Sequence, residues 1–290
     1  MSDATRFVRK QNIIALVLGL GLVAFTTLVA RQFLGRLALP FVVVVIASGL
    51  WAHVRGGGPV PRNLQPVSPT VHPELYRLVQ ILVHRGGLTR VPDIYFLPMR
   101  GYNAATLWTG PEPMLVITPA LLNGLSPREL SAVLAHEVAH IKNGDFVIYT
   151  VARVLQSITV ILSQAAWILL FFFFPFLLLS GAVISLGSML ILAAAPFVGI
   201  AIQMALLRAR EFSADLGAAE LTGDPEALAS ALRRIDQSSK SIWEQLFPVL
   251  RQSAGIFMSH PATEERIRRL RTLTPPGSGF APRRVGWSRV

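Results

Sequence analysis

Apolar segments and segments of mixed polarity alternate along the 290-residue chain. Residues 13–30 and 37–52 are uncharged and apolar, and no charged residue occurs in residues 154–207. About 20 apolar residues are enough for a helix to cross the hydrocarbon core of a bilayer. The first two segments therefore predict one transmembrane helix each, and the third predicts two, separated near Ser180 and Gly181. The pattern predicts an integral membrane protein with four transmembrane helices in two hairpins.

The first apolar segment has an alternative interpretation as a signal peptide, because Arg6, Arg9 and Lys10 precede it. Residues 28–30, which read Leu-Val-Ala, do not form a small-x-small cleavage site, and a second apolar segment follows at once. The sequence therefore favours a retained helical hairpin.

The segments of mixed polarity predict a helix-rich α+β domain. Residues 55–69 are rich in Gly and Pro and predict a linker. Beyond the linker, apolar residues recur at helical spacing until Gly86 and Gly87. Three short strands are then predicted, at residues 93–97, 104–108 and 114–118. The predicted fold class is mainly α, with a small β-sheet beside the helices.

A capping box predicts the start of the next helix. Ser126 and Glu129 have the spacing of its two members, and the helix continues through the segment HEVAH. The four-residue spacing places His136 and His140 on one face, about 6 Å apart along the axis, where two imidazoles can bind one metal ion. Glu137 can reach a metal-bound water without binding the metal. Two surface histidines are the alternative, which the well-delimited helix disfavours.

A third ligand is expected, because zinc in hydrolytic sites usually has three protein ligands and one open position. Glu211 is the candidate, in a separate helix predicted at residues 208–221. Asp215 lies four residues later on the same face, where it can accept a hydrogen bond from a ligating histidine. Arg208, Glu211 and Asp215 could instead form a solvated charge ladder at a membrane surface. The HEVAH motif favours the metal site.

Composition restricts the metal and the partners. The chain has no cysteine, so His, Asp or Glu must hold any metal. Hydrophobic residues make up 52% and charged residues 15%, a balance that suits a lipid bilayer better than water. The net charge of +11 is concentrated at the ends of apolar segments and in the C-terminal tail, which favours anionic lipid over nucleic acid. With the candidate ligands and base named above, we expect one Zn²⁺ per chain. We also expect a water molecule, deprotonated by Glu137, to attack the carbonyl of a peptide bond.

Three motifs in this order resemble those of the HtpX family of membrane zinc metalloproteases, bacterial relatives of the CAAX prenyl proteases. The motifs are HEVAHIKNGD, REFSAD with the LGAAELTGDPEALASALRRI that follows it, and SHPATEERIRRL. The similarity extends over about residues 73–273. The resemblance implies a zincin-like metalloprotease domain and the same site residues as the spacing does: zinc ligands His136, His140 and Glu211, catalytic base Glu137, and Asp215 as the residue that orients a ligand histidine.

The resemblance also implies substrate contacts that spacing cannot show. His260 and Arg266 correspond to a histidine and an arginine that contact the substrate carbonyl in related enzymes. Read locally, His260 is a helix-start residue before Pro261, and Arg266 lies on a helix surface. Asn103 and Ala104 correspond to an edge-strand segment that pairs with the substrate backbone. Here NAATLWTG replaces a shorter NAFATG-like segment, so the strand register and the substrate preference are expected to depart from the family pattern.

Basic residues flank the predicted spans on one side, which the positive-inside rule assigns to the cytoplasm. Arg31 and Arg36, between the first two spans, are a modest signal in the other direction. We expect a multi-pass protein of the inner or plasma membrane whose termini and catalytic domain face the cytoplasm. The predicted parts are an N-terminal hairpin (1–54), the linker (55–69), a metalloprotease domain (70–274) with a hairpin inserted at about 150–207, and a basic tail (275–290).

The expected function is an endopeptidase that cuts misfolded or damaged membrane proteins. A CAAX-type processing protease is an alternative by kinship, although the chain is short for one. A transporter or channel is disfavoured because the predicted spans lack charged residues. A scaffold with a structural zinc is disfavoured because such a site closes with four protein ligands and has no use for an adjacent carboxylate such as Glu137.

Overall fold

The computed structural model describes residues 3–55, 63–99, 101–108, 112–180, 186–246 and 263–273. Its internal contacts divide the chain into two compact units. Unit 1 comprises Met1–Gln11, His53–Phe146 and Arg210–Val290, and unit 2 comprises Asn12–Ala52 and Val147–Ala209. Unit 2 therefore consists mainly of the segments that the sequence predicts to enter the membrane. The finer domain boundaries, and the tail beyond the described residues, stay predictions.

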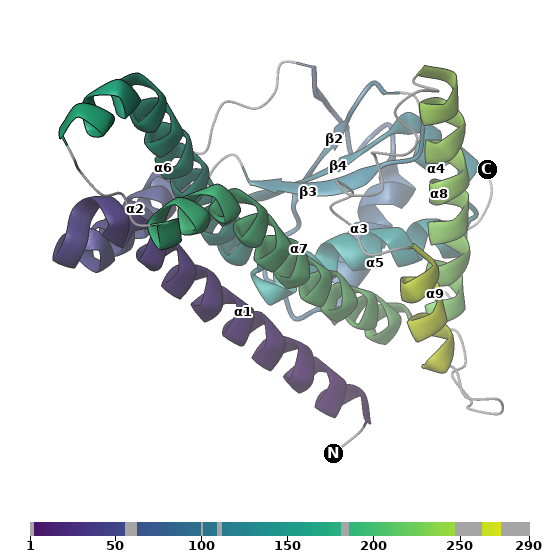
Figure 1. The fold of residues 1–290 in the computed structure, drawn as a ribbon. Coiled ribbons are helices and arrows are strands. Elements are labelled where there is room, and N and C mark those ends of the chain that lie inside the picture. The colour runs from purple at the N-terminus through teal and green to yellow at the C-terminus, as the bar shows by residue number, and fades with distance from the viewer. Residues whose placement is uncertain are drawn as a thin grey trace. The chain divides into compact units, whose positions relative to one another are not determined.

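The described part of the chain is mainly helical, as predicted (Figure 1). Its helices are α1 (Asp3–Leu34), α2 (Ala38–Arg55), α3 (Pro73–Arg85), α4 (Pro119–Gly124), α5 (Pro127–Asn143), α6 (Asp145–Ser180), α7 (Leu186–Thr222), α8 (Pro225–Leu246) and α9 (Thr263–Thr272), with a 3-10 helix η1 (Gly35–Leu37) between α1 and α2.

The strands of unit 1 form a four-stranded sheet in the order β1-β2-β4-β3. β2 (Asp93–Phe96) lies parallel to β4 (Pro113–Ile117), and β3 (Ala104–Trp108) lies antiparallel to β4. These three strands confirm the prediction to within one residue at each end. β1 (Gln65–Pro66) pairs with β2 inside the segment predicted as a linker, so that prediction is wrong for these two residues. An edge strand tolerates the missing N–H of a proline, which is why the Pro-rich segment can still pair.

α5 lies in the apolar core of unit 1. Twelve consecutive residues of this helix, from Glu129 to His140, are buried. Its Leu134 belongs to the same buried cluster as Leu78 of α3 and Leu115 of β4. A helix that is buried on this scale holds its side chains in fixed positions, so the motif that α5 carries is rigidly placed.

The ends of α5 confirm the sequence signals. The Ser126 hydroxyl accepts a hydrogen bond from the Glu129 backbone N–H, and the Glu129 carboxylate accepts one from the Ser126 N–H at 2.9 Å. The helix ends at Gly144, whose φ of 64° is a left-handed conformation that glycine adopts without strain. The chain can therefore turn sharply into α6 directly after the motif.

In unit 2 the chain reverses between α1 and α2. Thr26 Oγ1 lies 3.3 Å from Thr159 Oγ1 of α6, and a Cβ added to Gly49 would lie 2.9 Å from Val154 Cγ2 of the same helix. A continuous helix would separate residues 26 and 49 by roughly 35 Å, whereas residues 154 and 159 are roughly 8 Å apart along α6. The two helices therefore fold back on each other at η1, which supports the predicted hairpin.

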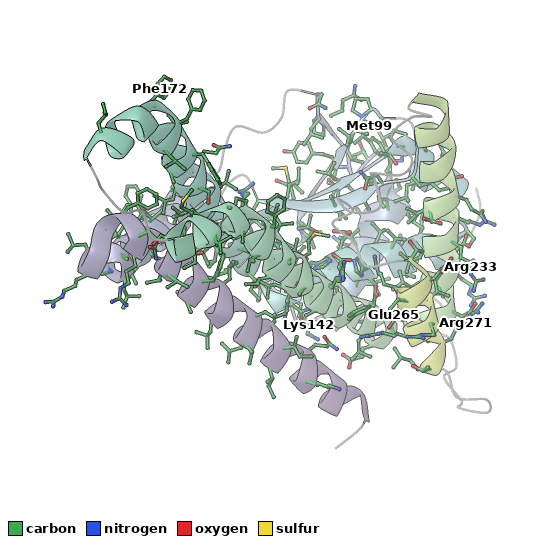
Figure 2. The ribbon with its side chains drawn as sticks, viewed as in Figure 1. Met99, Lys142, Phe172, Arg233, Glu265 and Arg271 are labelled. Carbon is green, nitrogen blue, oxygen red and sulfur yellow. The ribbon has the colours of Figure 1, made fainter. Side chains whose placement is uncertain are left out.

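Three helical segments of the described chain are long and apolar enough to cross a membrane: Lys10–Ala52, Asp145–Phe172 and Gly187–Thr222. The first contains most of α1 and most of α2. Unit 2 exposes large apolar side chains, among them Phe171 at 79% and Phe172 at 72%, and Figure 2 shows Phe172 projecting from α6. Lipid contact accounts for such faces. The crossing number of four, which counts α1 and α2 separately, stays a prediction.

α7 differs from the prediction because it runs unbroken from Leu186 to Thr222. The sequence predicts a separate polar helix at residues 208–221, but no proline follows Pro196 within α7, and nothing else ends the helix before Gly223, with a φ of 68°. Gly217 packs closely on α5, since a Cβ there would lie 2.8 Å from the Ala139 Cβ. One continuous helix therefore leads from the apolar segment to the side of α5.

Candidate active site

Side chains of α5 and α7 converge in unit 1. The Nε2 atoms of His136 and His140 are 3.1 Å apart, and the Glu211 carboxylate lies 3.5 Å from the first and 3.7 Å from the second. One ligand atom from each residue lies within 4.8 Å of the other two. All three residues are buried. The structure thus brings together the three residues predicted as metal ligands, and their role as ligands stays a prediction.

The carboxylate contacts of the two histidines fit a cation. His136 Nδ1 lies 3.1 Å from Asp215 Oδ1, and His140 Nδ1 lies 2.7 Å from Asp145 Oδ2. A carboxylate at Nδ1 favours the tautomer that carries its proton there, which leaves a lone pair on Nε2. Two Nε2 lone pairs and the Glu211 carboxylate then face one another, an arrangement that a cation stabilises. Tetrahedral zinc, with bonds of about 2.1 Å, places its ligand atoms about 3.4 Å apart, close to the observed separations.

The electrostatics at His136 also favour positive charge. Burial lowers the pKa of His136, but the contacts with Asp215 and Glu211 outweigh burial and raise the pKa to about 10. The surroundings of the ring therefore stabilise a positive charge at this position. A divalent cation would supply that charge in place of the proton, so the residues present fit a bound metal.

The Glu137 carboxylate is hydrogen-bonded to the sheet. Thr106 Oγ1 of β3 donates to Glu137 Oε2 at 2.9 Å, and Glu137 is buried. The bond orients a carboxylate that lies one residue from His136. Glu137 is not one of the three predicted metal ligands, His136, His140 and Glu211, which we call the ligand group. Sequence reasoning did not single out Thr106, because the contact depends on how β3 crosses α5.

β3 forms one edge of the sheet, and the segment predicted to pair with substrate lies at its start. The Asn103 carbonyl accepts a hydrogen bond from the Thr118 N–H at 2.9 Å, and the Asn103 N–H donates to Thr118 Oγ1 at 3.1 Å. Backbone groups alternate in direction along an antiparallel ladder. Ala104, Thr106 and Trp108 therefore direct their N–H and C=O groups toward the open edge, while Asn103 faces β4. Pairing with substrate stays a prediction.

Arg266 of α9 contacts both carboxylates that α7 brings to the site. Its Nε and Nη2 donate to the two oxygens of Asp215 at 2.8 and 2.6 Å, and its Nη1 lies 3.2 Å from Glu211 Oε2. Burial lowers the pKa of Arg266, but Asp215 and Glu211 outweigh burial and raise it above its ordinary value, so the guanidinium stays charged. These contacts brace the ligand group. The predicted contact of Arg266 with a substrate carbonyl stays a prediction.

Residues 72–274, more than half of the chain, match peptidase family M48. The chain belongs to this family. Among similar relatives, a protease HtpX homolog of Ralstonia nicotianae is 36% identical over 232 residues, which cover 74% of this chain and 79% of the relative. One of Nostoc punctiforme is 37% identical over 222 residues, covering 72% and 76%. One of Trichormus variabilis is 32% identical over 280 residues, covering 89% and 86%.

These findings confirm the resemblance read from the motifs. The M48 match begins at the residue before α3 and ends just after α9, so it contains every residue of the ligand group and its carboxylate and guanidinium partners. The chain is therefore a protease of the M48 family, and it has helices apolar enough to lie in a membrane.

The sequence reasoning missed two residues beside this site, and one predicted site residue falls outside the described part of the chain. Asp145 and Arg210 form a buried ion pair next to His140 and Glu211. A signal for Asp145 existed, because it stands five residues after His140 at the end of the motif helix, but its partner could not be known without the turn at Gly144. His260 lies outside the described residues, and its predicted contact with substrate stays a prediction.

Proposed function

We propose that this M48 protease is a zinc-dependent endopeptidase with one zinc ion per chain. The observation that carries the proposal is the buried group of His136, His140 and Glu211, with Glu137 beside it on the same helix. Nitrogen and oxygen ligands of this kind suit zinc. Within the described part of the chain the group has three members, the number typical of catalytic zinc sites, whereas structural sites have four. This count favours the enzyme over a non-catalytic scaffold.

The residues around the ligand group have distinct roles in the proposed mechanism. When bound, zinc would polarise the substrate carbonyl and lower the pKa of water. Glu137 accepts a proton from the attacking water and later donates it to the leaving amine. Thr106 keeps the Glu137 carboxylate in place through its hydrogen bond. Asp215 and Asp145 hold the two imidazoles with Nε2 toward the other ligands.

The proposed substrates are polypeptides, in particular misfolded or damaged membrane proteins. An extended segment can pair with the open edge of β3, where Ala104, Thr106 and Trp108 offer backbone groups on the strand that also contacts Glu137. Backbone pairing places few demands on substrate side chains, which suits a protease that removes varied proteins. The apolar helices of unit 2 would keep the enzyme at the bilayer, where membrane proteins are within reach.

Zinc removal is expected to abolish proteolysis, and zinc alone is expected to restore it. The full-length protein in detergent is stripped with a chelator, and zinc content and cleavage of a labelled membrane protein are measured together. His140→Ala is expected to lose both zinc and cleavage, because the ligand group then has two members. Arg128→Met is the control, since Arg128 is largely exposed and pairs with Asp224. Full activity in protein that contains well under one zinc per chain would contradict the proposal.

The proposed orientation places both termini and the protease site in the cytoplasm, with four membrane crossings. It rests on the basic residues that flank the apolar helices and on the reversal between α1 and α2. A topology reporter fused after Ser180, the last residue of α6, is therefore expected on the outer side of the membrane. A reporter that is active only in the cytoplasm would contradict the four-crossing arrangement.

A further inference from the structure

A buried ion pair joins the two points where the inserted helices leave and re-enter unit 1. Asp145 is the first residue of α6, and Arg210 lies on α7, one residue after the segment Val147–Ala209 of unit 2. Arg210 contacts Asp145 Oδ1 through both Nε and Nη2. Asp145 is 0% exposed and Arg210 is 4% exposed. The ion pair thus joins the start of α6 to α7 at residues that both belong to unit 1.

The same carboxylate also contacts the ligand group. Asp145 Oδ2 lies 2.7 Å from His140 Nδ1, while Oδ1 receives the guanidinium of Arg210. One oxygen therefore orients the imidazole, and the other is held by the arginine. Arg210 in turn is the residue directly before Glu211 on a continuous helix. Contacts therefore run from Arg210, which adjoins the predicted ligand Glu211, through Asp145 to the ring of the predicted ligand His140.

We propose that Asp145 and Arg210 form a positioning pair that sets the spacing between His140 and Glu211. The inference rests on the proposed metal site and deepens it, because it names a contact that helps to keep His140 and Glu211 together. His140 and Glu211 lie on different helices that are separated in sequence by the whole inserted hairpin. Without the pair, the imidazole loses the carboxylate that fixes its tautomer, and α7 keeps contacts such as that of Asp215 with His136, which do not involve His140. The separation between Asp145, at the start of α6, and Arg210 of α7 is therefore expected to affect the affinity for metal.

The chemistry of the Asp145–Arg210 pair determines how much each substitution is expected to weaken metal binding. A guanidinium can contact one oxygen through two N–H groups and stays charged when buried, which an ammonium reproduces only in part. Residues that orient a metal ligand typically change metal affinity by 10- to 100-fold when they are replaced. Asp145 acts through His140 and Arg210 acts through Asp145, so replacing both should cost little more than replacing Asp145 alone. Such non-additivity is the signature of residues that work as one unit.

The test is a double-mutant cycle on zinc affinity, measured by competition with a chelator of known affinity in the detergent-solubilised full-length protein. Arg210→Met and Asp145→Asn are each expected to weaken zinc binding by about 10- to 100-fold, and the double variant by less than the product of the two. Arg210→Lys is expected to bind zinc with an intermediate affinity, and as the mildest change it keeps the test available if Arg210→Met does not fold. The absorption spectrum of the cobalt-substituted Asp145→Asn variant is expected to shift, because the donor ring of His140 is re-oriented.

Two controls separate this inference from the proposed metal site. Arg128→Met removes an exposed ion pair that also begins on α5 and is expected to leave zinc affinity unchanged. His140→Ala tests the ligand itself. If the wild type binds zinc and His140→Ala does not, yet Arg210→Met and Arg210→Lys both keep wild-type affinity, the positioning role is wrong and the metal site stands. Effects of the two single variants that multiply fully would also overturn the inference. If the wild type binds no zinc, the proposed function itself fails.

Discussion

Replacing Glu137 with Gln is expected to lower kcat for peptide cleavage by about 10²- to 10⁴-fold, the range that general acid–base catalysis contributes. The amide keeps the shape of the side chain and can still accept the hydrogen bond of Thr106, but it cannot take a proton from water. Because Glu137 is not a member of the three-residue ligand group, the zinc content is expected to stay at the wild-type level. The measurement is kcat on a labelled membrane protein with zinc quantified in the same sample. Since the inactive variant keeps its ligand group and strand edge, it also serves to retain and identify substrates.

Variants of Thr106 provide the matched comparison for this experiment. Thr106→Val keeps the branched shape and removes the hydroxyl that donates to Glu137 at 2.9 Å. A lost hydrogen bond of this kind is worth about 1 kcal/mol, so kcat should fall about fivefold while zinc content and KM change little. Thr106→Ser keeps the donor and should stay near the wild type. A Glu137→Gln enzyme that retains more than half of the wild-type kcat would exclude Glu137 as the base.

The local parts of the site could be predicted from the sequence because their signals are local. The Ser126–Glu129 capping box and the glycine after Asn143 fixed the ends of α5, and the four-residue spacing put two histidines on one face of it. Asp215 was singled out because it follows Glu211 by one helical turn. The structure places its carboxylate at His136 Nδ1, which the spacing could not specify, since that choice depends on how α7 lies against α5.

The contacts of Thr106 and Arg210 could not be predicted, because each depends on packing geometry that no short pattern encodes. Thr106 reaches Glu137 across 31 residues of sequence, and Arg210 reaches Asp145 across 65. The unbroken course of α7 has the same origin: polarity changes at Arg208, but a change of polarity does not end a helix, whereas a glycine with positive φ does. Composition therefore predicts two helices where the structure has one, with the predicted boundary at the end of the apolar segment.

Replacing Arg266 with Met is expected to destabilise the protease unit by about 3–5 kcal/mol, the cost typical of removing one partner from a buried ion pair. Arg266 is 5% exposed, donates hydrogen bonds to both oxygens of Asp215 and forms an ion pair with Glu211. Met has a similar length and apolar stem, so the loss reports charge and hydrogen bonds more than volume. The free energy of unfolding is measured by denaturant titration in detergent. Arg268→Met is the matched control on the same helix, because its side chain is 75% exposed, and only a small change is expected.

Zinc should reduce the effect of Arg266→Met, and this dependence separates bracing from a purely structural role. In metal-free protein the two buried carboxylates of α7 lose their guanidinium and keep only the His136 ring as a partner on α5, whereas in zinc-loaded protein the ion supplies a larger positive charge beside Glu211. The destabilisation is therefore expected to be larger without zinc than with it. Equal destabilisation in both forms, or a cost no greater than that of Arg268→Met, would contradict the bracing role. If the zinc-loaded Arg266→Lys variant is stable but has a reduced kcat, that loss measures the predicted contact of the guanidinium with the substrate carbonyl, because the ligand group is then intact.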